Sequence, residues 1–203
     1  MSVITISRQF GAGGITLGNM VAQRLGYSFV DNEIIQRMAE RAKVSENWVA
    51  SIEKEVGGKL QKFVSGLLSK SFFDRLLDND KGYIDEEIYM DLLEQIVRQL
   101  AAEDNVIILG RGSQYILRQQ PDTFHVLLIA SREDRVAFME KKYALSTAQA
   151  FKSVAAMERR RANLYRKFGK ENFDDPGLYH LVINRSRVSL HKACDLVCKV
   201  VAA

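Results

Sequence analysis

Short apolar runs rich in β-branched residues alternate along the chain with longer segments whose apolar residues recur at helical spacing. A short apolar run bounded by glycine or polar residues is typical of a buried strand, and a period of three to four residues is typical of an amphipathic helix. The pattern predicts five strands, at 3–7, 27–30, 106–109, 124–130 and 181–184. It predicts helices that begin after the glycines at 11–14, near Asp31, near Asp85, near Ser131, at Thr147 and at Val188.

Strands that alternate with helices predict a parallel sheet covered by helices on both faces. We therefore expect one α/β domain over residues 1–203, doubly wound around a five-stranded sheet. The stretch at 43–90 breaks the alternation, because its pattern is almost wholly helical and Gly57, Gly58 and Gly66 interrupt it. We interpret this stretch as a helical insert.

The composition is that of a folded globular protein. The 203 residues are 47% hydrophobic and 27% charged, which excludes a disordered chain. No apolar run reaches the ~18 residues of a membrane span, and the start lacks the layout of a signal peptide. Cys194 and Cys198 form neither a disulfide framework nor a four-cysteine zinc site, so we expect both in the core. We expect a reduced, cytoplasmic protein without a membrane partner, and expect His125 to pack within the sheet.

The net charge of +4 is unevenly placed. Residues 132–192 hold 14 Lys and Arg against 7 Asp and Glu, whereas the remainder holds 15 against 18. A local basic surplus favours an anionic partner, either nucleic acid or phosphate groups, and the alternative is a solvated basic helix face. Arg159, Arg160 and Arg161 are consecutive and point around a helix, so at most two of them can line one site. We therefore do not expect nucleic acid as the partner.

Polar residues stand at the carboxyl ends of the predicted strands, where ligands bind in parallel α/β sheets. They are Ser7-Arg8, Asp31, Gly110-Arg111 and Asn184-Arg185. This clustering predicts a ligand site at that edge of the sheet.

The segment Ser7–Gly18 has the strand, glycine loop and helix layout of a phosphate-binding loop. The strict pattern G-x-x-x-x-G-K-[ST] fails, because Arg8 stands at its first glycine and Gly14 at its lysine. The dinucleotide pattern G-x-G-x-x-G fits Gly11 and Gly13, but Thr16 takes its third place; Asp31 lies where a ribose-binding acid is expected. Three interpretations stay open: nucleotide phosphates, a dinucleotide, or a turn that only connects two elements.

Arginines favour the first interpretation. Arg37, Arg111 and a late basic helix with Arg159, Arg161 and Arg166 converge on the expected ligand edge. Several arginines exceed what a single pyrophosphate requires, and they suit phosphoryl transfer, in which positioning and charge neutralisation supply most of the catalysis.

These residues resemble a known family. Residues 3–37 and 106–135 look like bacterial cytidylate kinases, and more closely the divergent cytidylate kinase-like group. The features that carry the resemblance are Ser7-Arg8-Gln9-x-Gly11-x-Gly13-Gly14, Asp31-x-Glu33-Ile34-Ile35, Gly110-Arg111-Gly112 and Val182-Ile183-Asn184. The resemblance spans nearly the whole chain and is weakest at 43–90.

The resemblance implies a three-layer P-loop NTPase-like fold and a phosphotransferase that uses ATP and Mg²⁺. Gly11, Ala12, Gly13, Gly14, Ile15 and Thr16 would cradle the ATP phosphates, with the Thr16 hydroxyl on the metal side. Arg37 and Arg111 would hold a nucleoside monophosphate or related small acceptor, and Asp31 would orient the acceptor or the metal's water shell. The insert at 43–90 would bind the acceptor and could pair with a second copy. Residues 146–178, with Arg159, Arg161 and Arg166, would form a lid.

The chain departs from true cytidylate kinases at Gly14, where they carry the loop lysine. Arg8 could reach into the site and replace the missing charge. The main alternative to an ATP-dependent kinase is a catalytically silent nucleotide-binding or regulatory protein on the same fold, and a further one is an NAD-binding protein.

Overall fold

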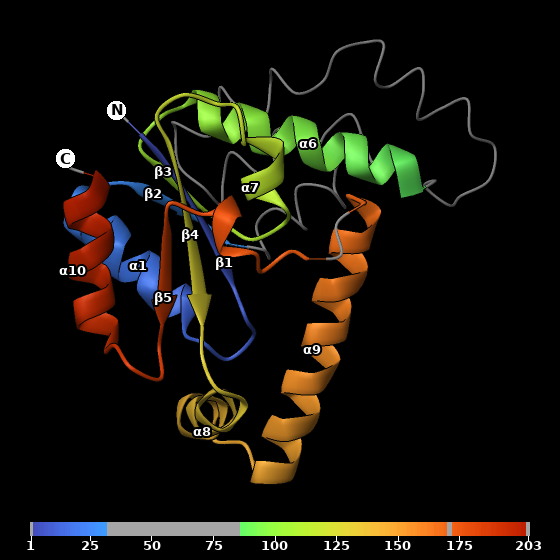
Figure 1. Cartoon of the computed structure of the whole chain (residues 1–203), viewed down its shortest axis with the longest axis vertical. Helices are drawn as coiled ribbons and strands as arrows, with labels where there is room; N and C mark the ends of the chain where they lie inside the picture. The colour runs from blue at the N-terminus through green and yellow to red at the C-terminus, as the bar shows by residue number, and fades with distance from the viewer. Residues whose placement is uncertain (1, 32–85, 170–171, 202–203) are drawn as a thin grey trace, which may run out of the picture. The chain divides into compact units, whose positions relative to one another are not determined.

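The computed structural model describes residues 2–31, 86–169 and 172–201. The chain divides into two compact units, residues 1–31 with 104–203, and residues 32–103. The elements described are β1 (Val3–Arg8), α1 (Gly14–Leu25), β2 (Ser28–Val30), α6 (Glu86–Ala102), β3 (Val106–Leu109), α7 (Ser113–Ile116), β4 (Thr123–Ile129), α8 (Arg132–Tyr143), α9 (Thr147–Lys167), the 3₁₀ helix η1 (Pro176–Leu178), β5 (Leu181–Asn184) and α10 (Leu190–Val201) (Figure 1). Most of the insert predicted at 43–90 lies outside the described residues.

The five strands form one parallel sheet in the order β2-β3-β1-β4-β5. This confirms the five-stranded parallel sheet predicted from the sequence. β1 lies at the centre, where Val3 pairs with Val106 of β3 on one side and with Thr123 of β4 on the other. The carboxyl ends of β1, β3 and β4 therefore meet at one edge of the sheet.

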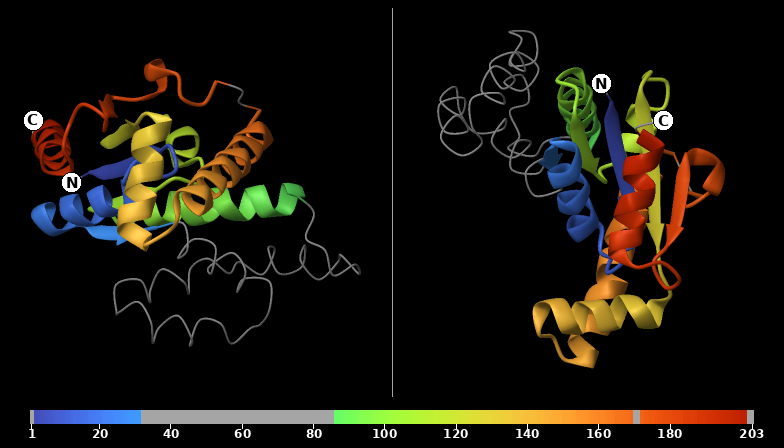
Figure 2. Two further views of the ribbon diagram at one scale, coloured as in Figure 1. Left: turned by 90° about the horizontal axis from the view of Figure 1, so that it is seen from below. Right: turned by 90° about the vertical axis from the view of Figure 1, so that its left-hand side faces the viewer.

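Alternation along the strands assigns one face of the sheet to α1 and α10 (Figure 2). Ile4 and Ile6 of β1 are fully buried in the same cluster as Leu17 and Val21 of α1. Burying each such side chain contributes about 1.5–3 kcal/mol. The cluster continues into α10 through Ala193, Cys194, Val197 and Cys198.

The opposite face of β1 is polar but equally buried. Thr5 hydrogen-bonds through Oγ1 to Nδ1 of His125 at 2.7 Å, and the hydroxyls of Ser7 and Tyr165 lie 3.0 Å apart. Tyr165 belongs to the last turns of α9, so this helix ends over the carboxyl end of β1. The expectation that His125 packs within the sheet is confirmed.

Serine caps fix the starts of α8 and α9. The Ser131 hydroxyl accepts from the Asp134 amide, and Ser146 forms a reciprocal capping box with Gln149. The two helices pack on each other through Val136, Met139, Ala150 and Val154, and Phe10 from the glycine loop packs against that cluster. The loop is thereby attached to both helices.

The two cysteines are reduced and buried, as the sequence predicts. They lie one turn apart in α10 with their sulfur atoms 4.0 Å apart, and burial raises the pKa of Cys198 to about 11. Both therefore act as core side chains rather than as reactive thiols. None of the helices described is long and apolar enough to cross a membrane.

Candidate active site

The glycine loop between β1 and α1 is a tight turn built on two left-handed glycines. Gly11 and Gly13 have φ values of 87° and 88°, and the Ala12 amide donates to the Gln9 carbonyl at 3.1 Å. A side chain at Gly11 would collide with α8, because its Cβ would lie 2.8 Å from the Arg135 carbonyl oxygen. Glycine is therefore required both by the backbone and by the close approach of the helix.

The amides that follow this turn are open to a ligand. Within the described part of the chain, the N–H groups of Gly11, Gly13, Gly14, Ile15 and Thr16 donate to no protein acceptor, and no side chain caps α1. They lie at the positive end of a twelve-residue helix. Such an array of donors suits a phosphate group.

A pocket surrounds these amides. Its floor is the loop, from Arg8 to Thr16, and its wall is the α8 face that carries Phe138, Met139 and Tyr143. It holds about 410 Å³ of space between atoms, part of it open to solvent. The glycine loop thus faces a concave surface with one apolar side.

Arg135 and Glu158 fasten the loop to the two helices. The Phe10 amide donates to Glu158 Oε1 at 2.8 Å, and Nη1 of Arg135 donates to the Phe10 carbonyl at 3.2 Å and to Glu158 Oε1 at 3.0 Å. The Arg135 side chain is only 11% exposed. A buried ion pair with these extra hydrogen bonds holds one defined geometry. The loop is therefore held in place before any ligand arrives.

Arg111 follows β3 in a backbone conformation that side chains rarely adopt. Its φ is 57°, between Gly110 at 75° and Gly112 at 71°, and the Gly110 amide donates to the Ile6 carbonyl of β1 at 2.9 Å. A left-handed arginine costs about 1–2 kcal/mol, and such strain concentrates at functional sites. Gly112 must stay small as well, because its Cβ would lie 2.3 Å from the Phe168 ring.

Arg8 ends β1 among charged neighbours. Burial is the main effect that lowers its pKa, and the charges of Arg161 and Arg111 lower it as well; Tyr165 and Asp31 act in the opposite direction, and the resulting pKa is about 10. The carboxyl ends of β1, β2 and β3 therefore bring Arg8, Asp31 and Arg111 within electrostatic range of one another. Three guanidinium groups (Arg8, Arg111 and Arg161) against two carboxylates (Asp31 and Asp174) leave a positive site.

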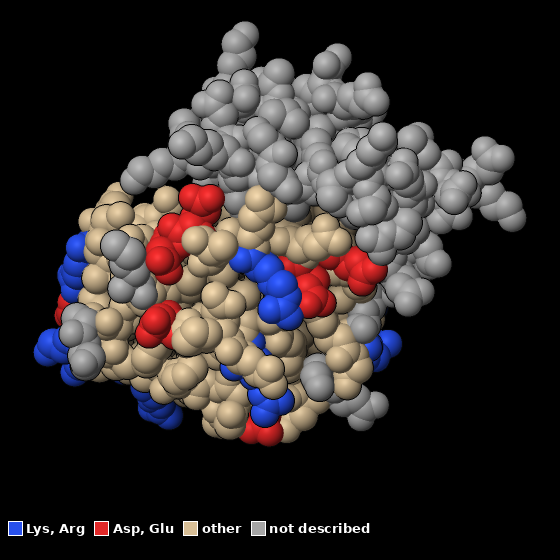
Figure 3. Space-filling view, turned by 90° about the horizontal axis from the view of Figure 1, so that it is seen from above, with Lys and Arg blue, Asp and Glu red and all other residues tan. Residues whose placement is uncertain are grey.

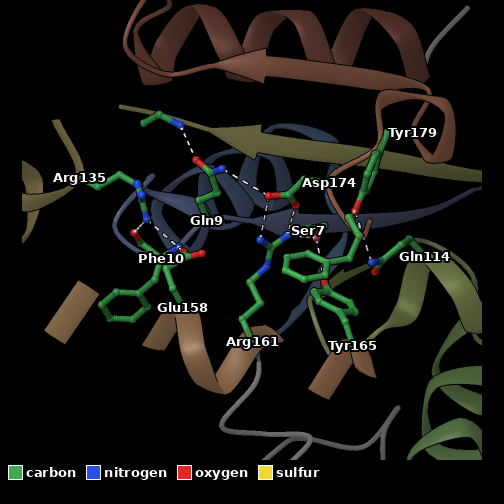
Figure 4. A network of polar contacts seen from close by, with 12 residues as sticks. Ser7, Gln9, Phe10, Gln114, Arg135, Glu158, Arg161, Tyr165, Asp174 and Tyr179 are labelled. Carbon is green, nitrogen blue, oxygen red and sulfur yellow. Dashed lines mark hydrogen bonds and ion pairs between the residues drawn. The ribbon is translucent and has the colours of Figure 1, made fainter. Parts of the chain in front are cut away.

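Arg161 is the arginine of α9 that reaches this edge (Figure 4). Its guanidinium donates to Ser7 Oγ at 3.2 Å and grips Asp174 through both terminal nitrogens, at 3.1 Å from Nη1 to Oδ2. It also lies over the Tyr165 and Phe173 rings, 5.1 and 4.7 Å from their centroids. Burial disfavours the charge of this 9% exposed side chain, but the Asp174 hydrogen bonds outweigh burial and raise the pKa of Arg161.

Gln9 joins the same network from the loop side. Its Nε2 donates to Asp174 Oδ2 at 3.3 Å, and its Oε1 accepts from the Ala130 amide at 3.1 Å (Figure 4). The segment after α9 is thus tied to the ends of β1 and β4. We refer to Ser7, Gln9, Arg161, Tyr165 and Asp174 as the α9 network.

The other sequence-predicted residues lie in different surroundings. Arg159 and Arg166 are exposed on α9, and Arg166 donates to Asn163. Thr16 is half-buried in the first turn of α1, and in the described ranges no three His, Cys, Asp or Glu side chains gather as a metal site. Arg37 lies outside the described residues.

Acidic and basic side chains are interspersed on the face drawn in Figure 3 rather than separated by sign.

Arg135, Glu158 and Asp174 are the contributors that sequence reasoning missed. Their contacts join segments 13 to 165 residues apart, and no local spacing signals such pairs. Asp174 did carry one signal, since it stands with Asp175 in an otherwise basic stretch.

The strand order separates the two nucleotide interpretations of the loop. In a dinucleotide-binding sheet β2 lies beside β1, so that its terminal acid reaches the ribose above the loop. In this sheet β3 lies between β2 and β1, which differs from the strand order of a dinucleotide-binding sheet. The NAD interpretation does not fit this topology.

Comparison with known proteins decides the family. The sequence profile of the cytidylate kinase-like family matches residues 3–187, which is most of the chain. The chain belongs to the cytidylate kinase-like family. Its fold is that of a P-loop kinase family. No curated protein matches the chain in sequence.

Solved structures agree on the fold of this family member. An uncharacterized protein from Eubacterium ventriosum superposes with a TM-score of 0.71 at 15% identity, over 99% of this chain and 98% of that one. A shikimate kinase from Bacteroides thetaiotaomicron gives 0.52 at 14% identity, over 100% and 99% of the two chains. A gluconokinase from Sinorhizobium meliloti gives 0.50 at 10% identity, over 99% and 91%. At these identities the likeness concerns the fold alone.

Proposed function

We propose that this protein is an ATP-dependent phosphotransferase that moves the γ-phosphoryl group of ATP to a small anionic acceptor of the nucleoside monophosphate type. The observation that carries the proposal is the set of open amides at Gly11 and Gly13–Thr16, which face a pocket lined by Arg8. Five N–H donors on a glycine turn form a cradle for phosphate oxygens that side chains would obstruct.

The residues present fit magnesium-bound ATP in three respects. The cradle supplies donors, the Thr16 hydroxyl stands two residues into α1 where it could take a metal's coordination position, and Arg8 supplies positive charge. MgATP would supply the phosphoryl group, and its γ-phosphorus would form a bond to the acceptor oxygen as the bond to the ADP oxygen breaks. The chain's own task is to bind and orient both partners and to exclude water.

Arg111 is the residue we assign to the acceptor. It stands at the end of β3, in electrostatic range of Arg8, on a strained backbone that fixes where its side chain begins. Ser113 Oγ and Gln114 Oε1 follow it, buried and without a hydrogen-bond partner in the described part of the chain. A planar guanidinium grips a phosphate or carboxylate by two hydrogen bonds. Asp31, at the end of β2 and therefore beyond β3 from Arg8, would orient the acceptor.

The first test is thermal stabilisation by ATP, ADP, NAD and each nucleoside monophosphate in turn, with magnesium present. A ligand at 100 times its dissociation constant adds about 2.7 kcal/mol. We expect stabilisation by ATP and by one monophosphate, ADP release when both are present, and no response to NAD. ATP binding without ADP release for any acceptor would instead identify a silent nucleotide-binding protein, and no response to ATP would overturn the proposal.

Replacing Arg111 tests the acceptor role. Arg111→Ala should lower turnover by about 100-fold or more while the affinity for ATP changes by less than threefold, because the lost hydrogen bonds act on the acceptor. Arg118→Ala is the matched control, since Arg118 is exposed and lies two residues after the end of α7. Unchanged turnover in Arg111→Ala would remove Arg111 from the site.

A further inference from the structure

Gly14 stands at the lysine position of the pattern G-x-x-x-x-G-K-[ST], and Arg8 fills the space beside it. A Cβ at Gly14 would lie 2.8 Å from Cγ of Arg8 and 3.3 Å from its Cβ and Cδ. These atoms form the stem of the arginine rather than its flexible tip. A lysine at 14 and the present position of Arg8 therefore exclude each other.

Arg8 and the open amides belong to one pocket. Arg8 lines it together with Gly11, Gly13, Gly14 and Thr16. The end of β1 and the start of α1 thus line the same pocket. Gly14, at the start of α1, has no side chain, and the long Arg8 side chain from the end of β1 lies beside it.

The surroundings of Arg8 favour a negatively charged ligand. Arg111 and Arg161 lie within electrostatic range, and together with burial they disfavour the charged form of Arg8, against the opposing effect of Asp31 and Tyr165. Arg161 is already neutralised by Asp174. An unliganded fold that keeps a disfavoured cation at a glycine loop is preorganised for an anion, because binding removes the repulsion.

We propose that Arg8 is the phosphate-gripping cation of this protein and that it replaces the P-loop lysine through the space left by Gly14. This proposal rests on the proposed function. An arginine differs from a lysine in presenting a planar fork, so Arg8 would hold two phosphate oxygens at once instead of acting as a point charge. Its origin on β1 leaves all the loop amides free for other oxygens.

The experiment measures two quantities, the melting temperature of the unliganded protein and its dissociation constant for MgATP by calorimetry. Arg8→Met should not lower the melting temperature, because methionine keeps an apolar stem beside Gly14 and removes a charge that burial disfavours, and it should weaken MgATP binding by at least tenfold. A merely structural arginine would lower the melting temperature when replaced. Arg160→Met, an exposed site on α9, removes the same charge and should leave both quantities unchanged.

A transplanted lysine provides the second arm. Gly14→Lys alone should weaken MgATP binding, because the new Cβ displaces the Arg8 stem. Arg8→Ala with Gly14→Lys should bind at least five times more tightly than Arg8→Ala alone, since only the 3.3 Å contact to Cβ remains and Gly14 has an ordinary helical backbone.

The outcomes separate this proposal from the proposed function. MgATP affinity within twofold of the unchanged chain in Arg8→Met, or no recovery in the double variant, overturns the role of Arg8 while the function stands. Absence of MgATP binding to the unchanged chain overturns the function and the role of Arg8 with it.

Discussion

His125 is a polar side chain held inside the sheet by two neighbours. Its Nδ1 lies 2.7 Å from Thr5 Oγ1, and its backbone amide donates to Nδ1 of His180 at 3.0 Å. Burial, and then the charge of His180, lower the pKa of His125 from 6.5 to about 4. The folded protein therefore keeps this ring neutral where an unfolded chain would protonate it.

The pKa of His125 predicts acid sensitivity of the fold. A base whose pKa is depressed on folding contributes stability that is complete above pH 6.5 and is lost as the pH falls towards 4. Between pH 7 and pH 4.5 we expect a loss of about 2–3 kcal/mol from this residue, by urea unfolding. The loss should shrink in His125→Gln and persist in His191→Gln, where the ring is exposed; an equal loss in both variants would contradict the assignment.

Helix α9 makes its contribution through one face and its last two turns. Arg161 and Tyr165, four residues apart, point to the sheet edge, whereas Arg159 and Arg166 stay exposed. The segment after the helix returns Asp174 to the same place, so the α9 network closes over the end of β1. We refer to α9 and Asp174 together as the strap, because the Arg161–Asp174 ion pair and the hydrogen bonds of the α9 network hold them to the end of β1.

Loosening this strap has a predictable effect. Asp174→Asn leaves a buried guanidinium without its carboxylate and should lower the free energy of unfolding by about 2 kcal/mol, less than a fully buried pair because Asp174 is 29% exposed. Inorganic phosphate should stabilise this variant more than the unchanged protein, since an anion can neutralise the Arg161 guanidinium that has lost its carboxylate.

The matched control for the strap is Asp175→Asn. Asp175 is exposed and adjacent in sequence, and its cap on η1 survives as asparagine. Equal responses of the two variants to phosphate would mean that Arg161 does not meet an anion.

At the scale of the whole molecule, local patterns predict elements but not their neighbours. The five strands lie within about one residue of their predicted limits, because each buried run is bounded by turn residues. Helix α7 and η1, four and three residues long, were not predicted, since neither is long enough for an apolar period to repeat. The order of the sheet depends on pairing between distant segments, which no single stretch of sequence specifies.

The site divides in the same way. Gly11–Thr16, Arg8 and Arg111 were predicted because strand ends and glycine turns are visible locally, and the structure brings these residues to one edge. Of the three arginines predicted on α9, only Arg161 reaches that edge, because the helical phase is set by which side of α9 packs against β1. The contacts of Asp174 with Arg161 and Gln9 could not be predicted from the sequence, because they depend on the fold.

The 2.8 Å approach between the Gly14 Cβ position and the Arg8 stem has a consequence for sequence comparison. The two positions cannot diverge one at a time. A lysine introduced at 14 collides with Arg8, and loss of Arg8 leaves the start of the glycine loop without its own cation. Substitutions at these two positions should therefore be epistatic. An alignment of this family should show Arg8 with a glycine at 14, or a lysine at 14 with a small residue at 8. It should lack sequences that combine Arg8 with a lysine at 14. A search for P-loop proteins that demands the lysine passes over every sequence of the first kind.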